Sequence, residues 1–396
     1  MTGTIAITVV TPVHGRTEMV ARLLASLARA QERYAGAADV LLVDSSPPPA
    51  ADSIAALAAA HGARVVRAPN DVRLKRNLGV RHAGGDVVLF VDSDCVADPN
   101  LLAEHAAGHA VARAPDGRPV AGVLGLVRTE GPETPAWRAA EAAGFCDSFA
   151  FAARWPQADW GPCANLSLRR DVLVALGGFR EDWPGRLGGD DVELGLRVTG
   201  SGRAILCRPG AVVAHDRATW ARWGAVGERA RRWGAMDVHV RAAMAAARRV
   251  PTGPGPAALL AVATALAATR AARLRRPRAM ARAALAVPAA LALAAPERGA
   301  AGARAGGAAL RVVFDLGTLA EAIRIGRPGL AFVALHPPDR PAARRRAMRR
   351  TAVATALLVA LKPLLAPRAR PGAGAALLRR YAPHRVGRQP RRRERG

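Results

Sequence analysis

The sequence predicts an α/β domain followed by a basic, Ala/Leu-rich and mainly helical C-terminal region. Two observations support this prediction. Strand-like and helix-like stretches alternate through the first 100 residues, as in parallel sheets with helices on both faces. The charge then divides the 396-residue chain: residues 1–240 hold 27 Lys and Arg against 26 Asp and Glu, whereas residues 241–396 hold 31 against 5.

The predicted strands are short apolar or β-branched runs, which are typical of buried parallel strands. They are expected at Ile5–Thr11, Asp39–Val43, Arg64–Arg67 and Asp86–Val91. Helices are expected between them at Glu18–Arg29, Asp52–Ala60 and Leu74–His82. Because ligands of such sheets bind at the carboxyl ends of the strands, the candidate site residues are the polar ones that follow: Thr11, Asp44 and Asp92–Asp94.

Composition excludes several classes of protein. With 51% hydrophobic residues, the chain is not of disordered composition. Its four Cys form no Cys-x-x-Cys pair, which argues against a disulfide scaffold and a zinc ribbon. All seven Trp lie between Trp137 and Trp233, where core packing, sugar stacking or a membrane-facing rim would each account for them.

The C-terminal region begins after a break at Pro251–Pro256, and its apolar stretches alternate with Arg clusters. The uncharged run Val250–Thr269 reaches the length of a bilayer span but contains Thr, Gly and Pro. We therefore expect peripheral attachment to an anionic membrane. Nucleic acid is a less suitable partner, because two Phe and one Tyr are the aromatic residues after position 240. The expected divisions are residues 1–240, a helical membrane-associating region at 251–366 and a disordered tail at 367–396.

Three local patterns indicate chemistry. Asp92 and Asp94 follow a strand, where two carboxylates could hold Mg²⁺ or Mn²⁺, or form a solvated acidic loop. Asp190, Asp191 and Glu193 lie within four positions. They could be a general base with its orienting acid, or the exposed first turn of a helix. His215 follows an apolar run, either as a structural histidine or as a metal contact.

Together these patterns resemble the family 2 glycosyltransferases, which have the nucleotide-sugar-binding GT-A fold. The resemblance covers roughly residues 5–240 and rests on six motifs in order: ITVVTPVHGR, LLVDSSPP, NDVRLKRNLGVRHAGGDVVLFVDSD, GPCANLSLRRDVLVALGGF, GGDDVELGLRV and PGAVVAHD. LLVDSSPP has the single Asp44 where the family usually has a pair of Asp. The segment Arg229–Trp233 has the Arg-Trp but not the Gln of the family's processive members, which implies a non-processive bacterial enzyme.

The resemblance implies a role for each matching residue. Asp191 would be the catalytic base, and Asp94 and His215 would hold Mg²⁺ or Mn²⁺. The nucleotide-sugar donor would be bound by Thr11, Pro12, Asp44, Arg76 and Asp92. Arg231 or Arg232 could contact its diphosphate, unless they form a solvated basic helix face. The acceptor side would include Asn165, Trp183, Asp190 and Glu193.

The function expected from these roles is transfer of a sugar, with inversion, from a nucleoside-diphosphate sugar to a hydroxyl acceptor. A lipid-linked or cell-envelope acceptor at the cytoplasmic membrane face would suit the basic C-terminal region. The alternatives are a soluble peptide-derived or small-molecule acceptor, and a non-catalytic protein that binds nucleotide sugars. A nucleotidyltransferase would also use paired acids and Mg²⁺, but the Asp191 and His215 motifs argue against it.

Overall fold

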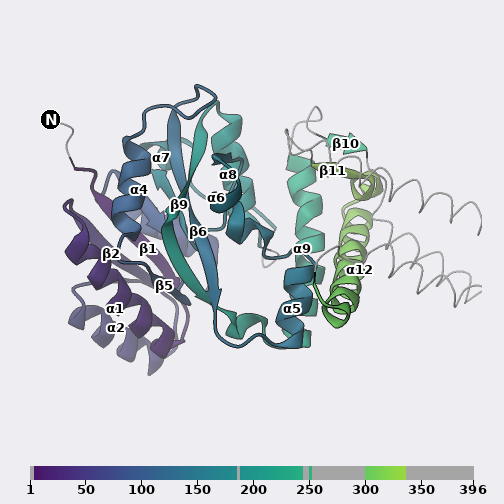
Figure 1. Cartoon of the computed structure of the whole chain (residues 1–396), viewed down its shortest axis with the longest axis horizontal. Helices are drawn as coiled ribbons and strands as arrows, with labels where there is room; N and C mark the ends of the chain where they lie inside the picture. The colour runs from purple at the N-terminus through teal and green to yellow at the C-terminus, as the bar shows by residue number, and fades with distance from the viewer. Residues whose placement is uncertain (1–3, 185–187, 244–248, 252–298, 336–396) are drawn as a thin grey trace, which may run out of the picture.

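The computed structural model describes residues 4–184, 188–243, 249–251 and 299–335. A mixed nine-stranded sheet lies at its centre, in the order β3-β2-β1-β4-β8-β6-β9-β5, with β7 paired to β9. Helices cover both faces, and α5, α9 and α12 form a further layer beside the sheet (Figure 1). The predicted α/β class is confirmed.

The first half of the sheet is parallel, as predicted. All seven expected elements form in the expected order, with bounds that differ by a few residues. The strands are β1 (Ile7–Val13), β2 (Ala38–Asp44), β3 (Arg64–Arg67) and β4 (Val87–Phe90). The helices are α1 (Thr17–Arg33), α2 (Ala50–Ala60) and α3 (Val72–His82), of which α3 begins after Asp71, whose side chain accepts hydrogen bonds from Arg73 N and Leu74 N.

The second half of the sheet is mixed, because β8 pairs antiparallel with both β4 and β6, and β5 pairs antiparallel with β9. Its strands are β5 (Cys95–Ala97), β6 (Val120–Glu130), β7 (Gln157–Ala158), β8 (Leu166–Arg169) and β9 (Ala204–Asp216). A separate antiparallel pair consists of β10 (Arg249–Pro251) and β11 (Val333–Leu335). The remaining helices are α4 (Leu101–Ala110), α5 (Pro135–Ala142), α6 (Phe151–Arg154), α7 (Arg170–Ala175), α8 (Asp190–Gly200), α9 (Trp223–Ala243) and α12 (Ala301–Arg324), with 3₁₀ turns η1 (Asp147–Ala150), η3 (Arg217–Trp220) and η5 (Pro328–Phe332).

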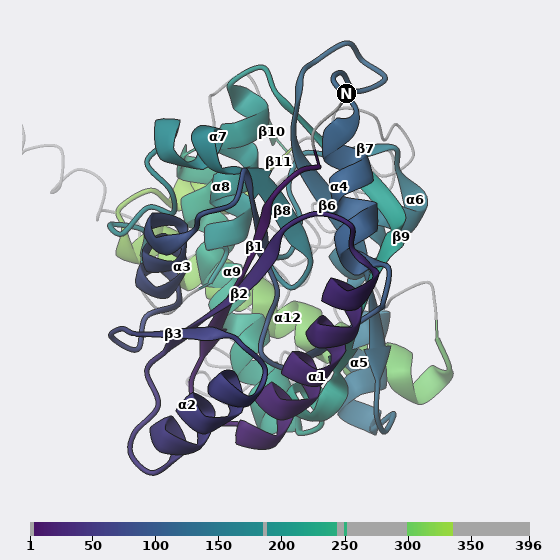
Figure 2. The same cartoon turned by 90° about the vertical axis from the view of Figure 1, so that its left-hand side faces the viewer.

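Two apolar cores lie on the two faces of the sheet. Successive side chains of a strand point to opposite faces, so Val9 packs with Leu23 of α1 in one core, and Val10 packs with Val80 of α3 in the other. Helices α1, α2 and α4 contribute to the first core, and α3, α7 and α8 to the second. Figure 2 shows α1 and α3 on opposite sides of β1 and β2. Each fully buried Leu or Val contributes about 1.5–3 kcal/mol.

The third layer joins residues far apart in the sequence, because α12 packs along α9 and α5. Gly234 and Gly317 allow this close approach: a Cβ at Gly234 would collide with the Phe314 carbonyl, and one at Gly317 with the Arg231 carbonyl. Thr318 Oγ1 also donates to Gly234 O at 3.0 Å. Helix α9 continues to Ala243, past the expected domain boundary at residue 240, and α12 packs against α9 and α5.

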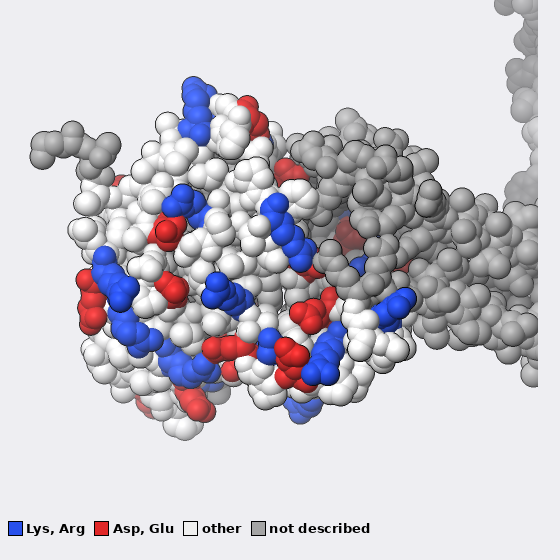
Figure 3. Space-filling view, in the orientation of Figure 1, with Lys and Arg blue, Asp and Glu red and all other residues white. Residues whose placement is uncertain are grey.

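The charge of the described surface is mixed. Figure 3 shows Lys and Arg interspersed with Asp and Glu on the face it presents, as the near-neutral count for residues 1–240 predicts. Within the described part of the chain, no helix has both the length and the hydropathy needed to cross a bilayer. Most of the region expected to associate with membranes, and the whole basic tail, lie outside the described residues.

Candidate active site

The carboxyl ends of β1, β2 and β4 lie side by side, because β1 is paired with both β2 and β4. Thr11 of β1 is fully buried, and its Oγ1 finds no hydrogen-bond partner among the described residues. Pro12, next along the strand, is half-buried. Thr11 and Pro12 are both predicted to contact the nucleotide-sugar donor. Of the two, only Pro12 is partly exposed, so only Pro12 could contact a nucleotide in this structure.

Asp44 ends β2 and is held within the protein. Its Oδ1 accepts from Ser46 N at 2.8 Å, and its Oδ2 is paired with the guanidinium of Arg67. Arg67 also donates to Ser46 O at 2.6 Å. Since Asp44 is 1% exposed, it shapes the loop after β2 in this structure, and a base that contacted it would have to displace Arg67.

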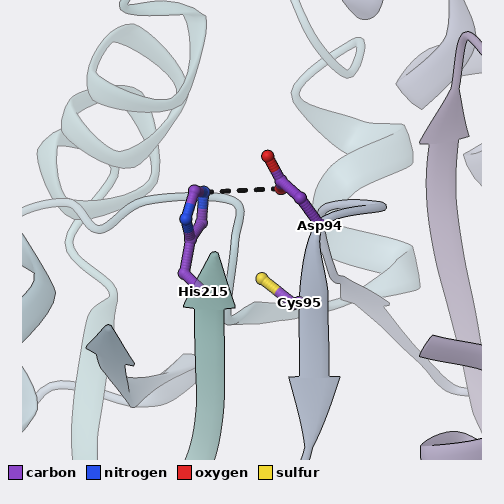
Figure 4. A group of neighbouring side chains, drawn as sticks. All are labelled: Asp94, Cys95 and His215. Carbon is purple, nitrogen blue, oxygen red and sulfur yellow. Dashed lines mark ion pairs between the residues drawn. The ribbon is translucent and has the colours of Figure 1, made fainter. Parts of the chain in front are cut away.

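Asp94 and His215 face each other across the ends of β5 and β9 (Figure 4). His215 Nε2 lies 3.4 Å from Asp94 Oδ1, and both side chains are buried. His215 Nδ1 lies 2.9 Å from Asp216 O. A carbonyl oxygen can only accept, so Nδ1 carries a hydrogen, and Nε2 is the ring atom that faces Asp94. When the ring is neutral, this nitrogen lone pair and the carboxylate oxygen are a pair of ligands that suits a divalent metal.

Arg16 binds the other oxygen of Asp94, with Nη1 donating to Oδ2 at 2.8 Å. Its backbone has φ 57° and ψ 43°, a left-handed conformation that is uncommon for a residue other than glycine. Such conformations concentrate at functional sites. This contact fixes the carboxylate of Asp94 and leaves Oδ1 for His215 or for a metal.

Arg76 of α3 bridges the Asp92 loop and helix α8. Its Nη1 donates to Asp190 Oδ2 at 2.5 Å, and its Nη2 lies 3.3 Å from Asp92 Oδ1. The guanidinium is buried over the ring of Phe179, 5.5 Å from the centroid. Buried charges need paired partners, so Arg76 holds together the two acidic segments that the sequence singles out, instead of extending into open space.

Neighbouring contacts fix the loop before α8. Asn77 Nδ2 donates to Phe179 O and its Oδ1 accepts from Phe179 N, both at 2.8 Å. Gly178 has φ 66°, and a Cβ there would lie 2.5 Å from Asn77 Oδ1. The Gly-Gly-Phe turn therefore requires glycine at this position and is held directly by α3.

Asp191 lies in the first turn of α8, which begins after Gly189. Gly189 has φ 75°, and a Cβ there would collide with Met236 of α9. Asp191 is half-buried, and Oδ1 accepts from Val192 N at 2.8 Å. Burial, followed by the negative charge of Asp190, raises the pKa of Asp191 to about 7. A carboxyl group with such a pKa can accept a proton near neutral pH.

Three of the predicted acceptor-side residues make internal contacts. Asp190 is buried and paired with Arg76. Glu193 forms a bidentate pair with Arg197 at 2.7 and 2.8 Å, and that guanidinium also donates to the Leu176 and Gly178 carbonyls. Trp183 is 4% exposed, and its Nε1 donates to Gly188 O at 3.1 Å. Each of these side chains positions the turn that presents Asp191.

Asn165 makes internal contacts as well. It is fully buried next to α4, where its Oδ1 faces His105 Nε2 at 2.8 Å. Its Nδ2 donates to Leu126 O at 3.1 Å and to Ala211 O at 2.9 Å. Because these hydrogen-bonding groups are used inside the protein, Asn165 has a structural role here, and its acceptor-side role stays a prediction.

Arg229, which the sequence analysis did not single out, is half-buried within the Arg229–Trp233 segment. Its guanidinium lies 3.9 Å from the Trp220 ring centroid. Burial, then the charge of Arg232, lowers the pKa of Arg229 to about 10, and Asp94 acts in the opposite direction. Arg231 instead pairs with Glu228 at 2.7 Å and is 55% exposed. Within this segment the positive charge that acts on Asp94 therefore comes from Arg229, in addition to that of Arg16, whereas Arg231 faces solvent.

Comparison with known proteins identifies the family of the N-terminal part of the chain. Residues 8–143, which include most of β1 and all of β2–β4, with Asp44, Arg76, Asp92 and Asp94, match the family described as glycosyl transferase family 2. Asp191 and His215 lie outside the matched residues. The matched part of the chain is a family 2 glycosyltransferase domain. The family prediction drawn from the six motifs is confirmed, and the sheet is mixed α/β as the predicted fold class requires.

Two further proteins are similar to this chain. The O-antigen biosynthesis protein RfbC of Myxococcus xanthus is 27% identical over 246 residues, which cover 57% of this chain and 18% of RfbC. The chain thus spans about a fifth of that relative. The structure of the mannosyltransferase PcManGT from Pyrobaculum calidifontis, in complex with GDP-Man and Mn²⁺, is similar with a TM-score of 0.47 and 18% identity, covering 90% of this chain and 87% of that one.

Proposed function

We propose that this glycosyltransferase is metal-dependent and inverting, and that Asp191 is its general base. The observation that best supports the proposal is the Arg76 bridge, which holds Asp92, at the strand end beside the Asp94–His215 pair, and Asp190, next to Asp191. Direct displacement requires the donor diphosphate, at the metal-binding pair, to lie close to the acceptor hydroxyl, at the base. The Arg76 bridge holds these two parts of the site together. One base and one displacement give inversion at the anomeric carbon.

Asp94 and His215 would hold Mg²⁺ or Mn²⁺. The residues fit such an ion, because Asp94 Oδ1 and His215 Nε2 face each other at 3.4 Å, and a carboxylate with a neutral imidazole is a suitable pair of ligands. When bound, the metal neutralises negative charge on the departing diphosphate. Arg16 and Arg229 would add fixed positive charge at the same end of the sheet.

Asp191 would accept the proton of the incoming hydroxyl. Asp190, paired with Arg76, keeps a negative charge beside it, and this charge together with burial accounts for the raised pKa of Asp191. Asn77, Gly178 and Trp183 fix the turn around it. The base is thus held by hydrogen bonds from several elements, as catalysis by a positioned group requires.

We propose a lipid-linked or cell-envelope acceptor at the cytoplasmic face of the membrane. The support is the excess of 31 Lys and Arg over 5 acids after residue 240, since each basic residue near an anionic surface contributes about 1 kcal/mol. The name of the RfbC relative points to the same class of acceptor. A full-length protein that stays in solution beside anionic vesicles at low salt would contradict attachment, and a soluble acceptor would then be favoured.

The test of the transferase activity is the release of nucleoside diphosphate from a panel of nucleotide sugars, with Mn²⁺ or with EDTA. We expect one donor class to be used, and EDTA to abolish turnover. Asp191→Asn should retain donor binding and lower transfer by about 10²–10⁴-fold, as for loss of a positioned base. Asp52→Asn, an exposed carboxylate on α2, is the matched control and should match wild type. Near wild-type turnover by Asp191→Asn would contradict the assignment.

A further inference from the structure

Cys95 lies at the pair that we propose to hold the metal. It follows Asp94 directly, begins β5 and is the cross-strand partner of His215. The Cys95 Sγ, a carboxylate oxygen of Asp94 and a ring nitrogen of His215 all lie within 4.8 Å of one another. In Figure 4 the sulfur lies below the line joining Asp94 and His215.

The three donors are buried and differ in how firmly they are held. Cys95, His215 and Asp94 are 1%, 7% and 9% exposed. His215 is oriented by Asp216 O and by the ring of Phe149, 5.5 Å away. The Cys95 thiol lies 3.9 Å from Ala164 O, a weak contact for a sulfur donor. A rotation of the thiol toward the pair would therefore break little that now stabilises it.

Sulfur changes which metals such a site prefers. Mg²⁺ and Mn²⁺ bind oxygen and imidazole ligands, whereas a set of sulfur, nitrogen and oxygen is typical of Zn²⁺. At a given site the affinity for Zn²⁺ also exceeds that for Mn²⁺. A metal that can use Cys95 as well as Asp94 and His215 would gain a third protein ligand.

We propose that Cys95 is a third protein ligand that gives this site a thiophilic mode, in which Zn²⁺ or Cd²⁺ binds through Asp94, Cys95 and His215 and excludes Mg²⁺ or Mn²⁺. On binding, the Cys95 S–H bond breaks, a metal–sulfur bond forms and the proton passes to solvent. No change of oxidation state is involved. The inference rests on the proposed metal-holding role of Asp94 and His215.

The test uses the full-length protein and two metals as separate probes. Mn²⁺ binding, followed by electron paramagnetic resonance, reports on Asp94 and His215. Cd²⁺ binding, followed by the ultraviolet cadmium–thiolate absorption, reports on sulfur. Cys95→Ser is compared with Cys207→Ser, which removes another buried thiol in the second core, and thermal unfolding checks that both variants fold.

We expect Cd²⁺ to give the thiolate absorption in wild type and in Cys207→Ser but not in Cys95→Ser. Zn²⁺ should displace Mn²⁺ from wild type, and Cys95→Ser should weaken Zn²⁺ by about 10-fold or more, the scale on which metal sites respond to disturbed surroundings. If Mn²⁺ binds and Cd²⁺ gives no thiolate absorption, or if the absorption persists in Cys95→Ser, the inference is overturned while the proposed function stands. If neither metal binds, both are overturned.

Discussion

Two buried clusters of polar side chains lie on this fold, and they differ in the distance between a histidine nitrogen and the oxygen that faces it. The His105–Asn165 cluster, under α4, also contains His109 and Ser167. The Asp94–His215 cluster lies at the ends of β5 and β9. Both pair a histidine with an oxygen ligand, but the Nε2–Oδ1 distance is 2.8 Å in the first and 3.4 Å in the second.

The His105–Asn165 pair is closed, although His109 Nδ1 in the same cluster is buried without a partner among the described residues. Asn165 Oδ1 accepts from His105 Nε2, so His105 Nδ1 must accept from Ser167 Oγ at 2.8 Å. His109 Nε2 then donates to the same Oγ, also at 2.8 Å. Both rings are therefore neutral, and burial lowers the pKa of His105 to about 4 and that of His109 to about 3.

The Asp94–His215 cluster is open. Asp216 O fixes His215 Nδ1, and Arg16 fixes one oxygen of Asp94. The remaining ring nitrogen and carboxylate oxygen face each other at 3.4 Å, longer than an ordinary hydrogen bond. Burial alone therefore does not distinguish a structural histidine from a ligand. The distinguishing feature is the longer separation of the two facing atoms.

The largest expected effect comes from breaking the open cluster. Asp94→Asn removes the charged oxygen that faces His215, and a metal contributes several kcal/mol of charge stabilisation at a diphosphate. We expect Mn²⁺ binding to be lost and transfer to fall by at least about 10²-fold. Mn²⁺ titration and the diphosphate-release assay measure this. An Asp94→Asn variant that bound Mn²⁺ like wild type would contradict the metal assignment.

The pH dependence of transfer tests the neighbouring base. The raised pKa of Asp191, about 7, means that the carboxyl is protonated below that pH and cannot accept a proton. We expect kcat/KM to rise about 10-fold per pH unit up to about pH 7 and then to level off. Asp190→Asn removes the neighbouring negative charge and should move this rise to lower pH. A profile flat between pH 5 and 8 would contradict the role of Asp191.

Breaking the closed cluster should change stability and leave catalysis intact. Asn165→Ala leaves His105 Nε2 and the carbonyls of Leu126 and Ala211 without their partner. Each buried group left unpaired costs about 1–3 kcal/mol. We expect a lower urea midpoint with unchanged KM for the acceptor. A raised acceptor KM at unchanged stability would instead support the predicted acceptor-side role of Asn165.

Acid should weaken the closed cluster selectively. Between about pH 6.5 and pH 4 the unfolded chain binds protons on His105 and His109 that the folded chain does not, so the free energy of unfolding falls as the pH falls through this window. Urea unfolding at several pH values measures the slope. The double variant His105→Gln, His109→Gln should show a shallower slope, and an unchanged slope would contradict the account.

Local sequence signals predicted the first half of the fold well. Strands and helices up to Phe90 follow from short apolar runs and from the polar residues between them. The same reasoning located Asp94, Asp191 and His215, because each follows a strand or opens a helix in a recognisable motif. Their assigned roles stay predictions until they are tested.

Contacts between side chains far apart in the sequence could not be predicted. The pairing of Arg76 with Asp190 and of Arg67 with Asp44 depends on the packed sheet. The internal partners of Asn165 could not be predicted either, because its motif gives no indication of which face its side chain occupies. One usable signal was missed: His105 and His109 are four residues apart and therefore share a helix face, which indicates a common buried partner.

The most direct test of the distinction between the two clusters is Mn²⁺ titration of His215→Gln and His105→Gln side by side, with thermal unfolding of both. We predict that His215→Gln loses Mn²⁺ affinity by at least about 10-fold and keeps its midpoint temperature, whereas His105→Gln keeps its Mn²⁺ affinity and unfolds at lower temperature. If His215→Gln bound Mn²⁺ like wild type, or His105→Gln lost Mn²⁺ affinity to the same extent, the distinction between an open site and a closed structural network would be contradicted.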